Sequence, residues 1–514
     1  MENTEITWIL FAVVITLMVY WIMKLMSLHQ YWKNCGICYL KPSPIFGNFF
    51  PVVSLNKSMG DMYKEAYFHY PNERIVGFYE LFKPVLIVRD PKLIEKILVK
   101  DFQYFTDHHQ ISEDQGLLSY GLFQLRGSAW RSVRYKISPA FTSGKLKVMF
   151  NGMVDCTDDL IKMIEKNLNK EFDVRNAISK YTIDVIASTV FGIQICNKSA
   201  LEKFIQMGTS IFNTTPARFV HLIAISQFPK LASWLGFRFI PDENTDYFKE
   251  LINTTLKQRE GGEFHRNDYT QQLLKLKEQN AIEVQSKDAD DDYLELNSAA
   301  PTENIEITND LLIGQAFQFL SAGFDPVLAA IMYVMYDLAR YPQIQERLRH
   351  HVQEVLKEHN EFSYACIKDM TYLEQCIQET LRMHSLAQFL FRECTKKYYL
   401  LEERLEIPKG MKVIIPIAAL HMDPKYYPDP EVYNPERFPP NVTRQNFTYL
   451  PFGDGPRICI GIRYALIVMK IALAKMVANY KFSLSPKTKV PFETNKQSII
   501  CLPKTKFLFN FTKA

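Results

Sequence analysis

Ten residues near the C-terminal end, Phe452 to Gly461, constrain this 514-residue chain more than any other stretch. They read Phe-Gly-Asp-Gly-Pro-Arg-Ile-Cys-Ile-Gly, so they surround Cys459 with three glycines and one arginine. Glycines let the backbone turn sharply and approach something bulky. An apolar pattern of helical spacing starts at Ile462, which places Cys459 near a helix N-terminus, where the helix dipole favours a thiolate. Such a thiolate can ligate a soft metal or act as a nucleophile.

The same stretch fills every fixed position of the pattern Phe-x-x-Gly-x-Arg-x-Cys-x-Gly and resembles the haem-binding loop of the cytochrome P450 superfamily. The resemblance implies that Cys459 is the axial thiolate of a haem b iron. It also implies that Phe452, Arg457 and Gly461 lie around the haem. The alternative is an inert buried cysteine, which would need neither the arginine nor the glycines. The chain looks most like the insect microsomal branch of the family, which oxidises xenobiotics and lipids.

The segment 6–23 is an uncharged apolar run of 18 residues, near the lower limit for a helix that crosses a bilayer. Glu2 and Glu5 precede the run, and Lys24 and Lys33 follow it. Because basic flanks remain in the cytosol, we expect an uncleaved anchor in the endoplasmic reticulum membrane, with the body facing the cytosol. The alternative is a cleaved signal peptide, which would have a basic N-terminal flank and a small-residue cleavage site.

The remaining organisation follows from composition and from the resemblance. We expect a membrane anchor in 1–33, a proline-rich hinge in 34–50 and one large haem-thiolate domain in 51–514. The expected fold is mainly α with a smaller β region, as in cytochromes P450. A net charge of +4 is too small to indicate a nucleic-acid partner, and nine scattered cysteines indicate reduced thiols. Cys35 and Cys38 have Cys-x-x-Cys spacing, but no second pair accompanies them.

A long apolar helical pattern runs through 309–340, and the resemblance places its middle on the distal side of the haem. The family pattern there is Ala/Gly-Gly-x-acid-Thr-Thr/Ser. This chain keeps Ala322, Gly323 and Asp325, which implies room for oxygen and a proton relay, but it has Pro326 instead of threonine. The family threonine opens the helix and helps deliver protons. A proline displaces a carbonyl at a cost of about 3 kcal/mol or more, so the helix opening can persist while the hydroxyl is lost.

Three further residues match family contacts to the haem propionates. Trp130 and Arg134 are one helical turn apart and share a face, although a surface helix would show the same spacing. Arg392 matches another propionate contact. Apolar residues expected to line a substrate pocket are Phe123, Phe212, Phe317 and Phe391.

Glu379, Arg382 and Arg437 resemble the Glu-x-x-Arg pair of the family and its partner arginine. The resemblance implies a buried charge network that braces the haem loop, whereas an isolated pair of this spacing is usually a solvated surface feature. The prolines that the family has after Arg382 are absent, and Ser385 stands in this region instead.

These features favour a membrane-anchored haem-thiolate monooxygenase that inserts one oxygen atom from O2 into a lipophilic xenobiotic, lipid or hormone. Electrons would come from NADPH through NADPH–cytochrome P450 reductase, with cytochrome b5 as a second donor, at a basic face near Lys136, Lys145 and Lys147. The apolar region 228–241 is either core or a loop that dips into the membrane. The alternatives are an oxygen-independent haem-thiolate isomerase or dehydratase, for which Pro326 would cost nothing, and a haem-binding protein with impaired turnover.

Overall fold

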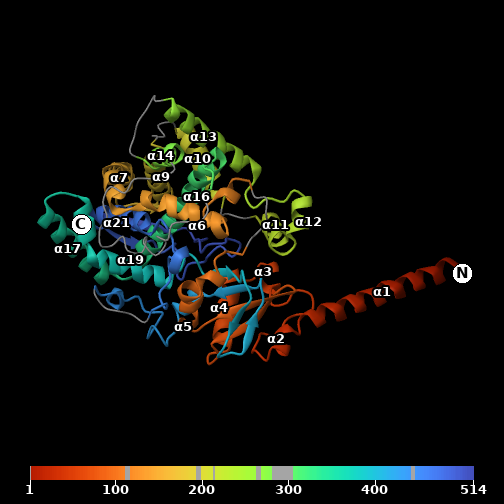
Figure 1. Ribbon diagram of the computed structural model, residues 1–514. Coiled ribbons are helices and arrows are strands. Elements are labelled where there is room, and N and C mark those ends of the chain that lie inside the picture. Colours follow the sequence, from red (N-terminus) through yellow and green to blue (C-terminus); the bar gives the residue numbers. More distant parts are fainter. Residues whose placement is uncertain are drawn as a thin grey trace. The chain divides into compact units, whose positions relative to one another are not determined.

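The computed structural model describes residues 2–109, 116–192, 198–211, 215–261, 268–279, 305–440 and 446–514. The chain forms two compact units. The smaller unit comprises residues 1–109 and 389–420, and the larger unit comprises residues 110–388 and 421–514. Helices dominate and the strands are short (Figure 1), which confirms the predicted mainly α fold with a smaller β region.

The smaller unit is built on a four-stranded sheet of order β1-β2-β7-β4. Strand β2 pairs antiparallel with β1 and parallel with β7, and β7 pairs antiparallel with β4. Every residue of β7 is buried, as expected for a central strand. The elements of this unit are α1 (Glu2–Leu28), α2 (Tyr31–Asn34), α3 (Phe50–Val53), α4 (Met59–His69), β1 (Ile75–Glu80), β2 (Lys83–Val88), α5 (Pro91–Glu95), η1 (Lys96–Lys100), η2 (Phe102–Tyr104), β4 (Leu390–Glu393), β5 (Tyr398–Leu400), β6 (Leu405–Ile407), β7 (Lys412–Ile415) and α20 (Ile417–Leu420).

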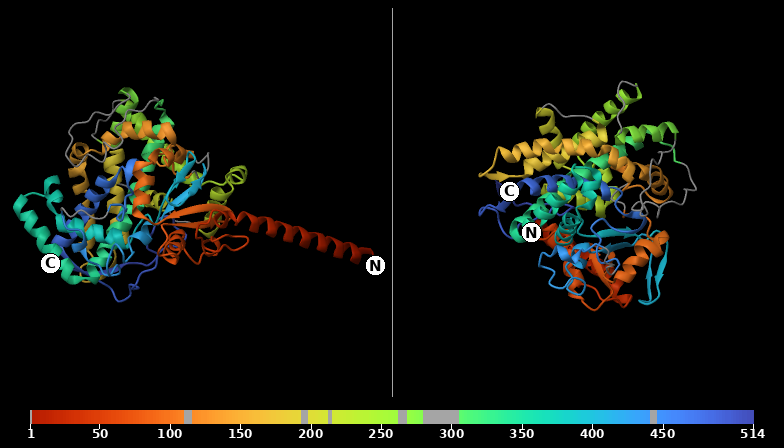
Figure 2. Two further views of the ribbon diagram at one scale, coloured as in Figure 1. Left: turned by 60° about the horizontal axis from the view of Figure 1, so that its bottom comes forward. Right: turned by 90° about the vertical axis from the view of Figure 1, so that its left-hand side faces the viewer.

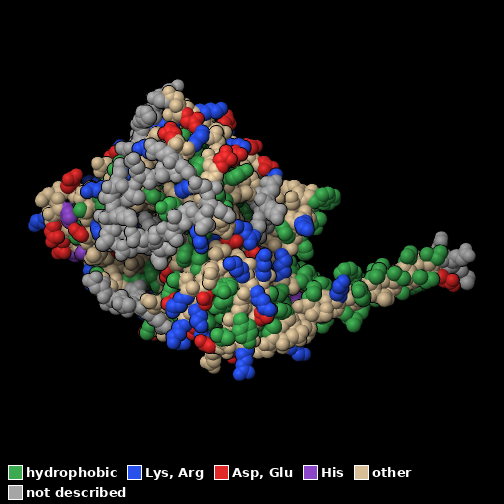
Figure 3. All heavy atoms as spheres, in the orientation of Figure 1, with side chains coloured by type: hydrophobic (Ala, Val, Ile, Leu, Met, Phe, Trp, Pro, Cys, Tyr) green, Lys and Arg blue, Asp and Glu red, His purple; other side chains and the backbone are tan. Residues whose placement is uncertain are grey.

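Helix α1 is the candidate membrane anchor. Its apolar span covers Glu5–Leu28, none of it buried, and Figure 3 shows hydrophobic side chains along its length. Among the described residues, one other helix, α16 (Asn309–Arg340), is long and apolar enough to cross a bilayer. Because 78% of the apolar window of α16 is buried, α16 is a core helix of the larger unit.

The larger unit is organised around α16, which packs against α9, α19 and α21 (Figures 1 and 2). The elements of this unit are η3 (Gly116–Tyr120), α6 (Gly127–Ile137), η4 (Ser138–Phe141), α7 (Ser143–Asp155), α8 (Thr157–Glu165), β3 (Glu171–Asp173), α9 (Arg175–Ile186), η5 (Ala187–Phe191), α10 (Lys198–Thr209), α11 (Pro216–Gln227), α12 (Pro229–Trp234), α13 (Asp242–Glu260), α14 (Tyr269–Gln279), α16, α17 (Pro342–His359), α18 (Tyr364–Asp369), α19 (Thr371–Met383), η7 (Pro435–Arg437), η8 (Gly455–Arg457), α21 (Ile462–Asn479), β8 (Tyr480–Leu484) and β9 (Leu508–Lys513).

The bounds of α16 follow from local signals in the sequence. The Thr308 hydroxyl accepts a hydrogen bond from the Leu311 N–H and caps the N-terminus. The helix ends at Arg340, and Pro342 follows as the first residue of α17. Helix α16 continues through Pro326, which has no N–H to donate to the Ala322 carbonyl. The predicted helix 309–340 is therefore confirmed, with the proline inside it.

Candidate functional site

The loop that carries Cys459 is closed by backbone hydrogen bonds within the larger unit. The Cys459 N–H donates to the Phe452 carbonyl at 3.0 Å, and the Gly453 N–H donates to the Leu450 carbonyl at 3.1 Å. Gly453 and Gly455 have φ values of +74° and +71°, a left-handed conformation that glycine adopts without strain. The glycines of the motif thus allow two tight reversals that bring Cys459 back beside Phe452.

The Cys459 side chain faces an open space inside the larger unit. The side chain is exposed, yet burial among the surrounding residues raises the pKa of its thiol. A side chain that is both exposed and deeply surrounded by protein lines an internal space. At Gly461, which caps the N-terminus of α21, an added Cβ would have no atom within 4 Å. The loop therefore leaves room beside the sulfur for a large group.

Two contacts favour the thiolate form of Cys459. The Gly461 N–H and the positive charge of Arg134 both lower the pKa of the thiol, but burial prevails. The position of Cys459 near a helix N-terminus predicted this favourable contribution to the thiolate, but it did not predict the larger, opposing effect of burial on the pKa. A metal cation at the sulfur would supply the missing positive charge, because a coordinating thiol is deprotonated outright. The donor chemistry of this loop fits a haem iron.

Helix α6 and the cysteine loop together form a cationic wall, made of Trp130, Arg134 and Arg457. Trp130 and Arg134 are both buried on α6. The Arg457 guanidinium lies over the Trp130 ring, 4.1 Å from its centroid, and donates to the carbonyls of Leu122 at 3.2 Å and Leu125 at 2.8 Å. The structure therefore brings Trp130, Arg134 and Arg457 together beside the cysteine loop. Buried guanidinium groups next to an open space suit a porphyrin, which carries two carboxylates.

Arg392 lies on β4 of the smaller unit, and only the family resemblance groups it with Cys459. Its side chain is buried, and burial lowers its pKa to about 10. Nη1 donates to the Phe391 carbonyl at 2.9 Å, whereas Nε has no hydrogen-bond partner among the described residues. A buried cation with a spare donor favours an anionic ligand.

The middle of α16 presents different faces to different surroundings. Ala322 is exposed within an otherwise buried stretch, and Pro326, one turn later, is half-buried. A Cβ added at Gly323 would lie 3.5 Å from Ile186 Cδ1, so Gly323 packs against α9. Ala322, rather than Gly323, lies at the open side of the helix.

Asp325 is a buried carboxyl with unused hydrogen-bonding capacity. Burial raises its pKa to about 7, opposed by the charge of Arg175. Its Oδ2 has no hydrogen-bond partner within the described part of the chain. A carboxyl of this pKa gains and loses protons near neutral pH, as a proton relay requires.

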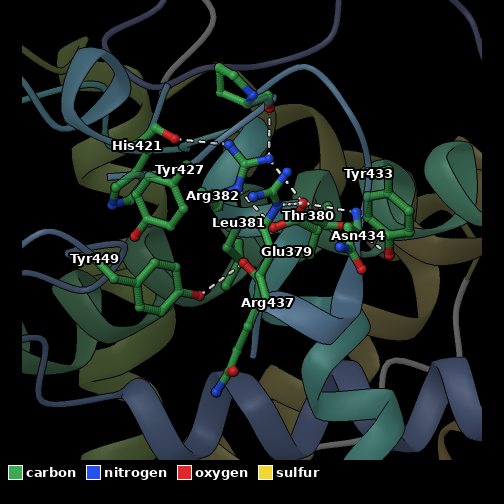
Figure 4. Close-up of polar contacts among 12 residues, drawn as sticks. Glu379, Thr380, Leu381, Arg382, His421, Tyr427, Tyr433, Asn434, Arg437 and Tyr449 are labelled. Carbon is green, nitrogen blue, oxygen red and sulfur yellow. Dashed lines mark hydrogen bonds and ion pairs between the residues drawn. The ribbon is translucent and has the colours of Figure 1, made fainter. Parts of the chain in front are cut away.

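Glu379 and Arg382 form a fully buried ion pair on α19 (Figure 4). Arg382 Nε donates to Glu379 Oε2 at 2.7 Å, and Nη2 donates to Oε1 at 2.9 Å. The other guanidinium protons reach the carbonyls of His421 and Pro430, both at 2.8 Å. These contacts exclude a solvated surface pair.

Arg437 joins the same network from η7. Its Nε lies 3.3 Å from Glu379 Oε1, and its Nη2 donates to the Asp429 carbonyl at 2.9 Å. The Asn434 N–H also donates to Glu379 Oε1, at 2.9 Å. The structure thus brings together the three charged residues that the sequence grouped, and it adds main-chain partners that no motif indicated.

The predicted pocket phenylalanines do not share one environment. Phe317 is fully buried and packs against Phe248, with ring centroids 5.6 Å apart, whereas Phe123 is exposed. Phe391 belongs to β4 of the smaller unit, and Phe212 lies outside the described residues.

The predicted basic face is also smaller than expected. Lys136 and Lys145 are buried, and only Lys147 of the three is exposed. Burial lowers the pKa of Lys136, whose Nζ reaches the Ile305 carbonyl. The prediction was wrong for two of these lysines because α6 and α7 pack their basic positions into the unit.

The chain is similar to known proteins over most of its length. The family model described as Cytochrome P450 matches residues 39–511. Cytochrome P450 6k1 of Blattella germanica is 33% identical over 494 residues, covering 94% of this chain and 93% of the relative. Cytochrome P450 6a2 of Drosophila melanogaster is 34% identical over 485 residues, covering 92% and 93%. Cytochrome P450 9e2 of Blattella germanica is 33% identical over 494 residues, covering 91% of each chain.

Proposed function

Because the chain belongs to the cytochrome P450 family and is a haem-thiolate monooxygenase, we propose that it holds its haem through Cys459 and that the haem is haem b. The observation that carries this proposal is the Cys459 sulfur itself, which faces an internal space beside the Gly461 N–H and the charge of Arg134. The bound haem supplies activation of O2, from which one oxygen atom enters the substrate. The oxygen-independent isomerase or dehydratase is not favoured by membership of this family.

The haem propionates would be held by the cationic wall. Arg134, Arg457 and the Trp130 indole N–H would supply donors from the larger unit, and the family resemblance assigns a propionate contact to Arg392 as well. Arginine suits this role because its planar guanidinium binds carboxylates with two parallel hydrogen bonds and stays charged when buried. The buried state of Arg392 and its spare Nε donor support this assignment.

Proton delivery would depend on Asp325. With a pKa raised by burial to about 7, its carboxyl can take up and release protons at neutral pH. Pro326 offers no hydroxyl to continue the relay, so protons would pass through water or through a hydroxyl of the substrate. Ala322, on the open side of α16, would leave room for O2, and Gly323 would set the packing of α16 on α9.

The apolar surface of the chain supports a membrane setting and a lipophilic substrate. Helix α1 would anchor the chain in the endoplasmic reticulum membrane with its body facing the cytosol, and the proposed parts are an anchor in 1–33, a hinge in 34–50 and a catalytic domain in 51–514. On α11 and α12 the apolar side chains of Val220, Leu231 and Trp234 are exposed, with Trp234 at 81%. We assign this patch to contact with membrane lipid.

Electrons would come from NADPH through NADPH–cytochrome P450 reductase, with cytochrome b5 as a second donor. A positively charged docking face would steer both partners. Of the lysines that the sequence suggested for this face, Lys147 is the one whose charge reaches the surface.

The test begins with the purified full-length chain. We expect an absorption band at about 450 nm when carbon monoxide binds the reduced protein, the signature of thiolate-ligated haem. Cys459→Ser should lose that band. Product formation from a lipophilic substrate should require NADPH, O2 and the reductase. A colourless native protein, or a Cys459→Ser protein with an unchanged spectrum, would contradict the proposal. Turnover of a lipid hydroperoxide without NADPH or O2 would instead indicate the isomerase chemistry.

A further inference from the structure

We propose that His421 is a positioning residue that joins the Glu379–Arg382 network to the segment leading into the Cys459 loop, and that Ser385 holds its imidazole in the required tautomer. His421 is fully buried in the larger unit. Its ring and its backbone carbonyl both make hydrogen bonds, and each bond points to a different part of the site. The inference rests on the proposed role of Cys459 as the iron ligand.

The hydrogen bonds of the ring determine its tautomer. His421 Nε2 lies 2.8 Å from the Leu450 backbone nitrogen, and Nδ1 lies 2.8 Å from the Ser385 Oγ. Because the Leu450 N–H can only donate, Nε2 must be the unprotonated nitrogen of a neutral ring. The proton therefore resides on Nδ1 and is donated to Ser385 Oγ. The Ser385 hydroxyl then donates to the carbonyls of Leu381 or Arg382, each 3.3 Å away.

The environment of the ring keeps this arrangement stable. Burial, together with the charge of Arg382, lowers the pKa of His421 to about 3, so the ring stays neutral and Nε2 remains an acceptor. The rings of His421 and Tyr449 are stacked with centroids 5.3 Å apart, and both are visible in Figure 4. The Tyr449 hydroxyl donates to the Gln378 carbonyl at 3.0 Å, which fixes the stacked ring on α19.

His421 contacts the charge network through its main chain. Arg382 Nη1 donates to the His421 carbonyl at 2.8 Å, while Arg382 also holds Glu379 in the bidentate pair (Figure 4). The position of the His421 backbone is therefore set by α19. A displacement of Arg382 would move the histidine and its ring together.

The other end of the connection is the cysteine loop. Leu450, whose N–H is held by His421, accepts the Gly453 N–H that closes the first reversal of the loop. The carbonyl of Phe452, which lies between Leu450 and Gly453 in the sequence, accepts a hydrogen bond from the Cys459 N–H at 3.0 Å. Only two backbone hydrogen bonds thus separate the His421 ring from Cys459. This contact path gives the buried charge network a physical route to the sulfur.

Ser385 distinguishes this chain from the family pattern at the point where the His421 ring is held. It stands in the region after Arg382 where the family resemblance implied prolines. A proline side chain has no oxygen to accept the Nδ1 proton of His421. Without an acceptor at Nδ1 the ring would gain by moving its proton to Nε2, which would then oppose the Leu450 N–H. Ser385 therefore selects the tautomer that holds the loop.

The test uses the full-length haem-loaded protein and follows the sulfur–iron bond by its spectrum. In the reduced protein with bound carbon monoxide, loss of thiolate ligation shifts the absorption band from about 450 nm to shorter wavelength. We would measure the rate of this conversion on mild warming, below the unfolding temperature of each variant as measured by circular dichroism. The variants are His421→Phe, which removes both ring contacts, His421→Gln, whose carbonyl can accept from Leu450, Ser385→Ala and Ser385→Thr. Tyr449→Phe is the matched control, because it removes the neighbouring, partly buried hydrogen bond to the Gln378 carbonyl and leaves the Leu450 N–H bonded to His421.

We expect His421→Phe and Ser385→Ala to convert at least about fivefold faster than the native protein, since each leaves a buried donor unsatisfied. His421→Gln and Ser385→Thr should stay within about twofold, and Tyr449→Phe should lower the unfolding temperature without faster conversion. Equal conversion in His421→Phe and Tyr449→Phe would overturn the inference. If His421→Phe does not fold, native-like conversion in Ser385→Ala would overturn it. A native protein without the absorption band at about 450 nm would instead refute the proposed role of Cys459.

Discussion

Arg457 stacks its guanidinium on the Trp130 ring, with Cζ 4.1 Å from the ring centroid. This contact joins α6 to the cysteine loop across more than 300 residues of sequence, because both side chains come from motifs that are far apart in the chain. The same guanidinium also holds the carbonyls of Leu122 and Leu125. The Arg457 side chain thus connects three segments: the residues that precede α6, α6 itself and the loop that carries Cys459.

Arg457→Lys should weaken haem retention although it keeps the charge. Lysine lacks the planar fork that stacks on Trp130 and reaches two carbonyls at once. We expect the haem-to-protein ratio of the purified variant to fall by about tenfold after dialysis against apomyoglobin, as expected for the loss of ~1.4 kcal/mol. Arg131→Lys, on the exposed side of α6, is the control and should retain haem. Native retention in Arg457→Lys would show that charge alone suffices.

Pro326→Thr should raise the product formed per NADPH and lower the hydrogen peroxide released. The substitution adds the hydroxyl that α16 lacks beside Asp325, and general acid–base assistance is typically worth about 100-fold or more in a proton-transfer step. Pro326→Ala serves as the control because it restores the backbone N–H without adding a hydroxyl. We expect coupling to improve several-fold in the threonine variant only. Equally tight coupling in all three proteins would refute the role assigned to the missing hydroxyl.

Asp325→Asn should remove a pH dependence of stability. In the folded chain burial raises the pKa of Asp325 to about 7, above its unfolded value, so the folded state binds more protons between about pH 4 and pH 7. The native protein therefore loses stability as pH rises through this window, by roughly 4 kcal/mol for this single group. Urea unfolding of both proteins at several pH values would measure the difference. A native-minus-variant difference that does not change with pH would contradict the assignment.

Glu379→Gln should destabilise the larger unit severely. It removes one charge of a fully buried bidentate pair and leaves Arg382 uncompensated, which costs ~3–5 kcal/mol. Chemical unfolding or the yield of haem-loaded protein would show the loss. Glu65→Gln is the matched control, because the Lys57–Glu65 pair is exposed on both sides and such pairs contribute less than about 1 kcal/mol. Similar losses in the two variants would mean that the Glu379 pair is not specially important.

Local patterns in the sequence predicted the parts of the site that depend on neighbouring residues. The apolar period and the Thr308 and Pro342 boundaries were enough for the 309–340 helix, and the glycines around Cys459 were enough for a tight loop before α21. The prediction that Lys136 and Lys145 are exposed was wrong, because whether a lysine reaches solvent depends on what packs over its helix.

The sequence by itself determined the family, the cysteine loop, the long core helix, the apolar anchor and the residues to compare, since each is encoded by residue types within a short stretch. Only the tertiary structure decided that burial raises the pKa of Cys459, that Arg457 stacks on Trp130, and that Ser385 and His421 lie between Arg382 and Leu450. Burial and hydrogen bonding depend on distances between segments that are remote in the chain, and no local pattern contains those distances.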